Sequence, residues 1–178
     1  MTRIDIQEQF KVTDQDKTIA YFAAMAVGLS LIDLSIPTPI AGIKPGLANI
    51  VVLICLVRFG FKTAFTVAIL RVLLTGLLVG TLFSPTFWLA LTGSISSLLA
   101  LKVCSLIPQK YLSVVSYSII AAFFHIAAQI ALISHWLIPM TAIYKLLPVF
   151  ALFALITGSI NGIATLIILG QSTYEDNI

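Results

Sequence analysis

The chain has 178 residues, of which 60% are hydrophobic and only 10% are charged, whereas a soluble domain carries about 25% charged residues. Its mean hydropathy is +1.09, and its apolar residues come in long runs, so the composition excludes a soluble fold. We therefore expect an all-α, polytopic membrane protein whose net charge of +3 reports topology and indicates no nucleic-acid partner.

The N-terminal residues 1–17 mix acidic and basic side chains, which predicts a cytoplasmic arm with no cleavable signal. A six-helix transmembrane domain is expected over 18–170, because about 20 apolar residues span a bilayer. The predicted stretches are 18–34, 46–58, 62–82, 86–106, 112–134 and 146–169. Residues 171–178 are expected to form a cytoplasmic tail. All seven prolines lie in or beside the predicted gaps, as expected of residues that disrupt helix interiors.

The second stretch is too short to cross a hydrocarbon core of about 30 Å as a helix. It follows a linker, Ser35 to Pro45, that holds three prolines and Gly42. Irregular backbone at membrane depth survives only where protein buries it or water fills a cavity. This pattern favours a linker that dips into the protein beside a cavity open to the outer side, and the alternative is a short, tilted packing helix.

The Lys and Arg residues indicate the orientation in the cell membrane. With a cytoplasmic N-terminus, the inner side carries Arg3, Lys11, Lys17, Arg58, Lys62, Lys102 and Lys110, and the outer side carries Lys44 and Lys145. Cytoplasmic loops are enriched in Lys and Arg. We therefore expect a multi-pass protein of the cytoplasmic membrane with both termini in the cytoplasm.

Arg71 lies in the middle of a predicted helix, about nine residues from its inner end. A buried arginine costs at least about 2.5 kcal/mol on insertion scales, so it is expected to face the bundle interior. It would either anchor an anionic or carbonyl-bearing ligand, or serve the structure, neutralised by carbonyl oxygens or by Asp33.

The fifth stretch contains His125 and Gln129 one turn apart, so both side chains face the same way. Counted along the helix, they are expected in the outer half, above the level that Arg71 reaches. The other residues expected around a polar pocket there are Asn49, Asp33 and Lys44. The alternative is a set of interhelical hydrogen bonds. Asn161 is expected too deep for the pocket, as a packing residue.

Small residues recur at four-residue spacing on several predicted helices. The first carries Ala20, Ala24 and Gly28, and the same spacing is found in Gly76 with Gly80 and in Gly158 with Gly162. Small residues allow close helix packing in lipid. The stripes therefore predict internal packing, or, for the first helix, docking of a partner membrane protein. A segment similar to Leu91–Ser96 also recurs at Ile156–Asn161, by duplication or by chance.

Signatures of catalysis are scarce. The two histidines lack nearby carboxylates, so no metal site is predicted, and the sequence identifies no cofactor. Asp33 is the only acid between residues 17 and 174, which leaves little material for acid–base or metal-assisted chemistry. We expect a protein that binds or passes a ligand rather than an enzyme.

Several segments resemble the Gx transporter family, which is also labelled heptaprenyl diphosphate synthase component I. They are Lys44–Ile50, Arg71–Leu74, Gly80–Pro85, His125 with Gln129, and Thr157–Gly162. The resemblance covers about residues 19–170. Ile126 departs from it, because the family pattern has Asn after the histidine.

The resemblance implies a six-helix bundle similar to the substrate-binding S components of energy-coupling-factor transporters. In those proteins a small-residue stripe on the first helix docks the transmembrane coupling subunit, which would give Ala20 and Ala24 that role. We expect a subunit that captures a small ligand from the outer side. The alternative is a non-catalytic accessory subunit of a membrane redox or isoprenoid-quinone pathway, with redox partner subunits. The aspartate-rich motifs of prenyl synthases are absent from the sequence.

Overall fold

The computed structural model describes residues 12–36, 46–108, 111–136 and 140–175, and their regular structure is entirely helical. Side chains are described outside 136–146 and 171–175. The helices are α2 (Asp14–Ser35), α3 (Ala48–Phe59), α4 (Phe61–Leu78), α5 (Pro85–Cys104), α6 (Val114–Trp136) and α7 (Met140–Glu175). The expected all-α class is confirmed, and the six helices of the described residues agree with the expected number.

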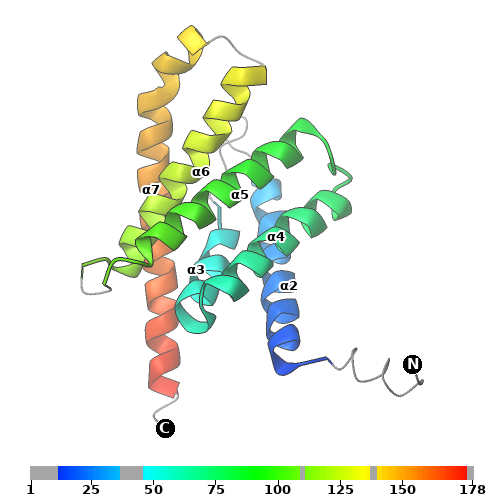
Figure 1. Ribbon diagram of the computed structural model, residues 1–178, viewed down its shortest axis with the longest axis vertical. Coiled ribbons are helices and arrows are strands. Elements are labelled where there is room, and N and C mark those ends of the chain that lie inside the picture. Colours follow the sequence, from blue (N-terminus) through cyan, green and yellow to red (C-terminus); the bar gives the residue numbers. More distant parts are fainter. Residues whose placement is uncertain (1–11, 37–45, 109–110, 137–139, 176–178) are drawn as a thin grey trace.

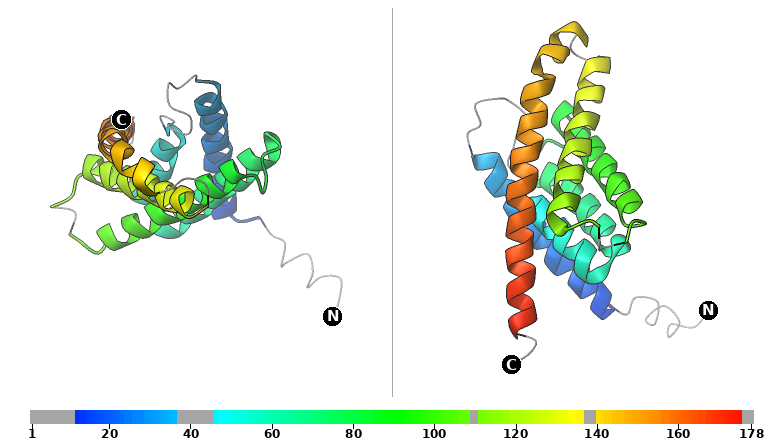
Figure 2. Two further views of the ribbon diagram at one scale, coloured as in Figure 1. Left: turned by 90° about the horizontal axis from the view of Figure 1, so that it is seen from above. Right: turned by 90° about the vertical axis from the view of Figure 1, so that its left-hand side faces the viewer.

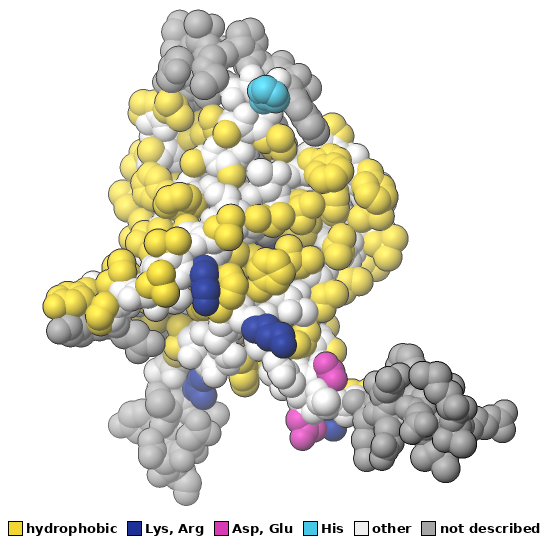
Figure 3. All heavy atoms as spheres, viewed as in Figure 1, with side chains coloured by type: hydrophobic (Ala, Val, Ile, Leu, Met, Phe, Trp, Pro, Cys, Tyr) yellow, Lys and Arg dark blue, Asp and Glu magenta, His cyan; other side chains and the backbone are white. Residues whose placement is uncertain are grey.

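Five of these helices are long and apolar enough to cross a membrane, and α3 is the shorter apolar helix that the sequence predicts. Large apolar side chains remain exposed on the outside of the bundle, where they cover most of the face shown in Figure 3. In water such a surface would be unstable, so it is the surface that contacts lipid. The protein is a multi-pass membrane protein.

The helices pack in two groups that meet along α3, α4 and α5. Helices α2, α3 and α4 contact one another, and α6 packs between α5 and α7. Contacts of α4 with α5, and of α3 with α6 and α7, join the groups, whereas α2 touches none of α5, α6 and α7 in the described part of the chain. Helices α4 and α5 run obliquely to α2 and α7 (Figure 1), and α7 extends past its neighbours at both ends (Figure 2).

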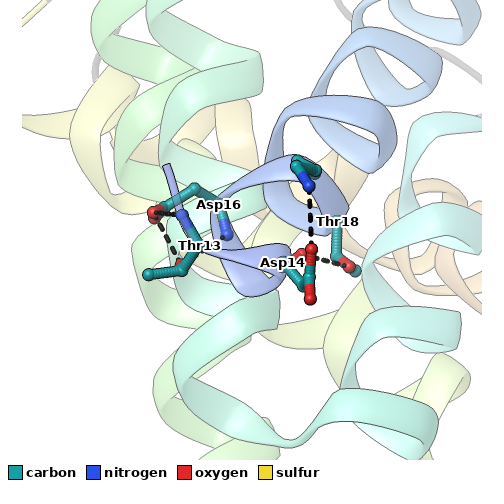
Figure 4. A network of polar contacts seen from close by, with 5 residues as sticks. Thr13, Asp14, Asp16 and Thr18 are labelled. Atoms are coloured by element: carbon teal, nitrogen blue, oxygen red, sulfur yellow. Dashed lines mark hydrogen bonds and ion pairs between the residues drawn. The ribbon is translucent and has the colours of Figure 1, made fainter. Parts of the chain in front are cut away.

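Helix α2 begins with a capping box, drawn in Figure 4. The Thr13 backbone N–H donates to Asp16 Oδ2 at 2.9 Å, and the Asp16 N–H donates to Thr13 Oγ1 at 3.2 Å. An ion pair of 2.9 Å joins Lys17 Nζ to Asp14 Oδ1. These contacts satisfy backbone donors of the first turn. The helix therefore starts at Asp14, inside the predicted arm.

The segment Gly80–Pro85, which resembles the family pattern, forms the turn between α4 and α5. Gly80 and Phe83 both have positive φ, at 71° and 63°, which stops α4 earlier than predicted. Ser84 Oγ then accepts the N–H of Phe87 at 3.3 Å, and Pro85 occupies the first turn of α5, where a missing N–H costs nothing.

Pro148 corrects one prediction, because it lies inside α7 and not in or beside a gap. The helix continues through it from Met140 to Glu175. Proline removes one hydrogen bond of the ladder, and membrane helices tolerate this loss where the rest of the helix and its neighbours hold the backbone. The predicted tail, residues 171–178, is accordingly helical as far as Glu175.

The described Lys and Arg side chains other than Arg71 gather at one end of the molecule. Lys17 lies in the first turn of α2, Arg58 and Lys62 flank the turn between α3 and α4, and Lys102 lies in the last turn of α5. The start of α2 and the end of α7 lie at this same end, the lower one in Figures 1 and 3. The grouping agrees with the charge pattern, and the compartment that this end faces stays a prediction.

Candidate ligand-binding site

A cavity of about 270 Å³ lies between the two groups of helices and is lined by residues from all six of them. For comparison, an engineered apolar protein cavity of about 150 Å³ binds benzene, and this cavity is nearly twice that size. Its polar lining comprises Ser30, Asp33, Asn49, Arg71, Thr75, Thr81, Thr86, His125, Gln129, Thr157 and Asn161. The remaining walls are mostly apolar, as is usual for pockets that take small molecules.

The cavity lies in the half of the molecule away from the basic end. Its lining comes from the end of α2, the beginning of α3, the second half of α4 and the first turns of α5. Each of these segments is the part of its helix remote from Lys17, Arg58, Lys62 and Lys102. The cavity and these four basic residues therefore occupy opposite halves of the molecule.

Arg71 joins three helices at the wall of the cavity. Its Nη1 donates to Asn49 Oδ1 of α3 at 3.2 Å, and its Nη2 donates to Ser94 Oγ of α5 at 2.7 Å. The Arg71 side chain is buried, as the cost of a charge in lipid predicts. Because Arg71 both ties helices together and lines the cavity, the two roles considered for it are compatible.

Asp33 supplies the opposite charge from the end of α2. It is 5% exposed, lines the same cavity as Arg71 and interacts with it electrostatically. A buried charge is tolerated when an opposite charge and hydrogen bonds compensate it. The cavity therefore contains one cationic and one anionic side chain.

On the α6 side, His125 and Gln129 form a short chain of polar contacts. The amide Nε2 of Gln129 donates to the Leu89 carbonyl oxygen at 3.3 Å and lies 3.2 Å from His125 Nε2. The imidazole lies against Gly93 of α5, where an added Cβ would be 2.6 Å from Nε2. No real Cβ contact is that short, so glycine is what lets the ring lie here.

Residues 22–168 match the family described as heptaprenyl diphosphate synthase component I. The chain belongs to this family. The matched range contains every residue that lines the cavity. No curated protein and no solved structure matches the chain.

The segments that resemble the component I family contribute to the cavity. Gly46 has a φ of 71° and its carbonyl oxygen accepts the N–H of Asn49 at 2.8 Å and the amide Nδ2 of Asn161 at 3.2 Å. Thr81 of the α4–α5 turn and Thr157 of α7 complete the lining. With Arg71, His125 and Gln129, all five family-like segments thus meet around one space.

Four of the five residues predicted for the polar pocket line this cavity, namely Asp33, Asn49, His125 and Gln129, and so does Arg71, which was predicted separately as a possible ligand anchor. Lys44 lies outside the described residues.

Two predictions of depth were wrong. Asn161 lines the cavity instead of lying too deep, and Arg71 shares that cavity with His125 instead of lying below its level. Both predictions counted depth along each helix as depth in the membrane. Because α4 runs obliquely (Figure 1), the position of a residue along its helix does not give its level.

Sequence reasoning missed Ser94 and Thr75. Ser94 is 2% exposed and receives the shorter hydrogen bond of Arg71, and Thr75 lies one turn beyond Arg71 on α4. Serine and threonine are common in membrane helices as packing residues, so their presence alone gave no signal. The recurrence of Leu91–Ser96 was the one sequence feature that included Ser94.

The small-residue stripes have different surroundings. Ala20, Ala24 and Gly28 are exposed on α2, away from the cavity, so internal packing is wrong for them within this chain. Gly158 and Gly162 pack on α6, where an added Cβ would come within 2.8 and 2.7 Å of backbone atoms. The stripe on α7 is therefore internal packing, as predicted.

Gly76 and Gly80 do not act as a pair. A Cβ at Gly76 would meet the ring of Phe87 at 3.0 Å, which makes it a packing position. Gly80 has nothing within 4 Å and serves the turn after α4 through its positive φ.

Proposed function

We propose that the protein is a substrate-binding membrane subunit, similar to the S component of an energy-coupling-factor transporter, that captures a small ligand. The observation that carries this proposal is the cavity itself. It draws its walls from all six helices and places Arg71, Asp33 and His125 around one space. Polar and ionisable side chains at membrane depth are costly, and their convergence on a cavity is typical of a ligand site.

The charge pattern supports capture from outside. Lys17, Arg58, Lys62 and Lys102 lie at the end remote from the cavity, and basic residues favour the cytoplasmic side. We infer that both termini are cytoplasmic, that the protein lies in the cell membrane and that the cavity belongs to the outer half.

Energised uptake would require partner subunits, because the sequence has no nucleotide-binding motif. Helix α2 offers a surface for one of them: Ala20, Ala24 and Gly28 are exposed there. Small residues let two membrane helices approach closely. We propose that this stripe docks the coupling subunit.

We further propose that the chain is not itself a catalyst. Among the described residues, Asp33 is the acidic side chain that lines the cavity, and it interacts with Arg71 and is thereby engaged. The family description names a component of a synthase, so catalysis in such a system would belong to another component.

A second function is favoured by the family description and the largely apolar cavity walls. The protein would then be an accessory subunit of an isoprenoid-quinone pathway, with an apolar tail in the cavity and carbonyl groups near His125 and Gln129. A lateral opening onto lipid would be needed, and within the described residues α2 does not contact α6 or α7, which is the place to look for one.

Purification from the native membrane tests both functions, with mass spectrometry of the bound small molecules and subunits. The uptake function predicts a small ligand together with a coupling subunit. Ala24→Leu should release the coupling subunit and retain the ligand, because position 24 is exposed on α2 and outside the cavity. A prenyl or quinone ligand with a synthase subunit would favour the second function, and a protein that retains neither ligand nor partner would contradict both.

A further inference from the structure

A second, much smaller cavity lies next to the ligand cavity, toward the basic end of the molecule. It has a volume of about 20 Å³ and is lined by residues of α3, α5, α6 and α7. The two cavities share Asn49, Ala122 and Asn161 in their walls. The other residues that line the small cavity lie nearer the basic end of their helices, and they are Val52, Leu53, Ser97, Leu101, Ser118 and Ala121.

The small cavity has the size and the lining of a site for one water molecule. A cavity needs about 10–15 Å³ to hold a water, and a buried water typically makes about three hydrogen bonds. A volume of about 20 Å³ is therefore enough for one water and too small for an organic molecule. Each of the four helices contributes one polar side chain to the lining, and these are Asn49, Ser97, Ser118 and Asn161.

Ser118 is the lining residue that most needs such a partner. It is 3% exposed, and its hydroxyl has no hydrogen bond to any residue in the described part of the chain. Helix α7 packs closely here, because an added Cβ at Gly162 would lie 3.0 Å from the Ser118 Cβ. Buried hydroxyl groups are usually paired with protein or with ordered water, and leaving one unpaired is costly. A water in the small cavity would pair with this hydroxyl.

The same water would reach both hydrogen-bond partners of Arg71. Asn49 accepts from Arg71 through Oδ1, so its NH₂ group remains to donate to the water. Ser97 Oγ donates to the Ser94 carbonyl oxygen at 2.9 Å, and the Ser94 hydroxyl accepts from Arg71. The Ser97 oxygen can still accept from the water. Together with Ser118, these groups supply three partners.

We propose that the small cavity binds one water molecule, held by Asn49, Ser97 and Ser118, which joins α3, α5 and α6 next to Arg71. The lining of the small cavity contains no charged side chain among the described residues, so it suits a neutral occupant better than an ion. This water site is additional to the proposed function and does not depend on which ligand the larger cavity takes.

Two substitutions of equal size at Ala121 test the water site, because Ala121 lines the small cavity and not the larger one. Valine and threonine would both displace the water, but only threonine has a hydroxyl that can replace its hydrogen bonds. Thermal unfolding of the purified full-length protein in detergent gives the comparison. We expect Ala121→Thr to melt about 3 °C above Ala121→Val, the shift that corresponds to one hydrogen bond.

Ala100 provides the matched control. It is buried within α5 at 6% exposed and lines neither cavity, so threonine should have no advantage over valine there. An equal difference between threonine and valine at positions 100 and 121 would overturn the proposal. A higher melting temperature for Ala121→Val than for the wild type would also overturn it, because filling the space would then cost no hydrogen bond.

A crystal structure of the unmodified protein that resolves ordered water gives a second test, which does not require a variant to fold. We expect one water within hydrogen-bond distance of Ser118 Oγ and the Asn49 amide. No density in the small cavity, or an ion in place of the water, would overturn the proposal. Those results would leave ligand capture by the larger cavity standing, since co-purification of a small molecule tests that function separately.

Discussion

Arg71 is the residue on which the bundle around the cavity depends most. It hydrogen-bonds to Asn49 and Ser94 and provides the charge opposite Asp33. We predict that Arg71→Gln destabilises the ligand-free protein by about 3 kcal/mol, because breaking a buried charge pair leaves the other charge uncompensated. Thermal unfolding in detergent measures this, and the double variant Asp33→Asn/Arg71→Gln should recover part of the loss. An unchanged melting temperature for Arg71→Gln would show that the contacts of Arg71 with Asn49, Ser94 and Asp33 do not stabilise the protein.

Gly93 provides a second test at single-residue scale. A Cβ there would lie 2.6 Å from His125 Nε2, so Gly93→Ala should displace the ring and destabilise the protein by about 1–3 kcal/mol. Gly28→Ala is the matched control, because it also lies within a long helix but has nothing within 4 Å. Chemical unfolding of both variants gives the comparison. Equal stability of the two would contradict the close packing of α5 against His125.

Which residues surround the cavity was largely predictable from the sequence. Arg71, Asp33 and His125 stood out because charged and strongly polar side chains are too costly to face lipid. Ser94 and Asn161 gave no such signal, since serine and asparagine serve equally well as packing residues. Their partners depend on how helices cross, and that information is not local in the sequence.

At the scale of elements, the turn before α3 positions Asn49 at the cavity through the backbone conformation of Gly46. Gly46 has a positive φ and an added Cβ would be 3.1 Å from Asn49 Nδ2, whereas Gly60 also has a positive φ but has open space around it. Alanine at either position should cost about 1–3 kcal/mol of stability through backbone strain. Only Gly46→Ala should also weaken ligand binding, because it displaces Asn49, a hydrogen-bond partner of Arg71.

Titration of the co-purifying ligand into Gly46→Ala and Gly60→Ala measures that difference. Equal affinities in the two variants would show that the Gly46 turn does not affect the site.

The boundaries of α3 and of the turn after α4 were predictable only to within a few residues. Hydropathy does not register the positive φ values of Gly80 and Phe83 that end α4.

At the scale of the whole molecule, the topology is open to direct measurement. Ser35 ends α2 at the cavity end, and Ser105 follows α5 at the basic end, and both are exposed. In a background with Cys55 and Cys104 replaced by alanine, we predict that Ser35→Cys reacts with a membrane-impermeant maleimide in intact cells. Ser105→Cys should react only after the membrane is opened, since basic residues favour the cytoplasmic side. Labelling of both from outside would contradict the orientation.

The arrangement of the helices was the part that the sequence did not predict. Composition and hydropathy gave six helices, because lipid leaves few alternatives for an apolar chain. Helix crossing angles depend on interhelical contacts such as those of Gly158 and Gly162 with α6. The oblique course of α4 (Figure 1), which brings Arg71 to the same cavity as His125, is a property of the assembled bundle.

The central claim is that the cavity between the two groups of helices holds the ligand, and native mass spectrometry of protein released from its own membrane tests it most directly. Ala90 lines the cavity, whereas Ala127 is exposed on α6 outside it. We predict a bound small molecule in the wild type and in Ala127→Phe, and its loss in Ala90→Phe, whose ring would take up part of the cavity. Retention of the same molecule by Ala90→Phe, or its absence from the wild type, would contradict the claim.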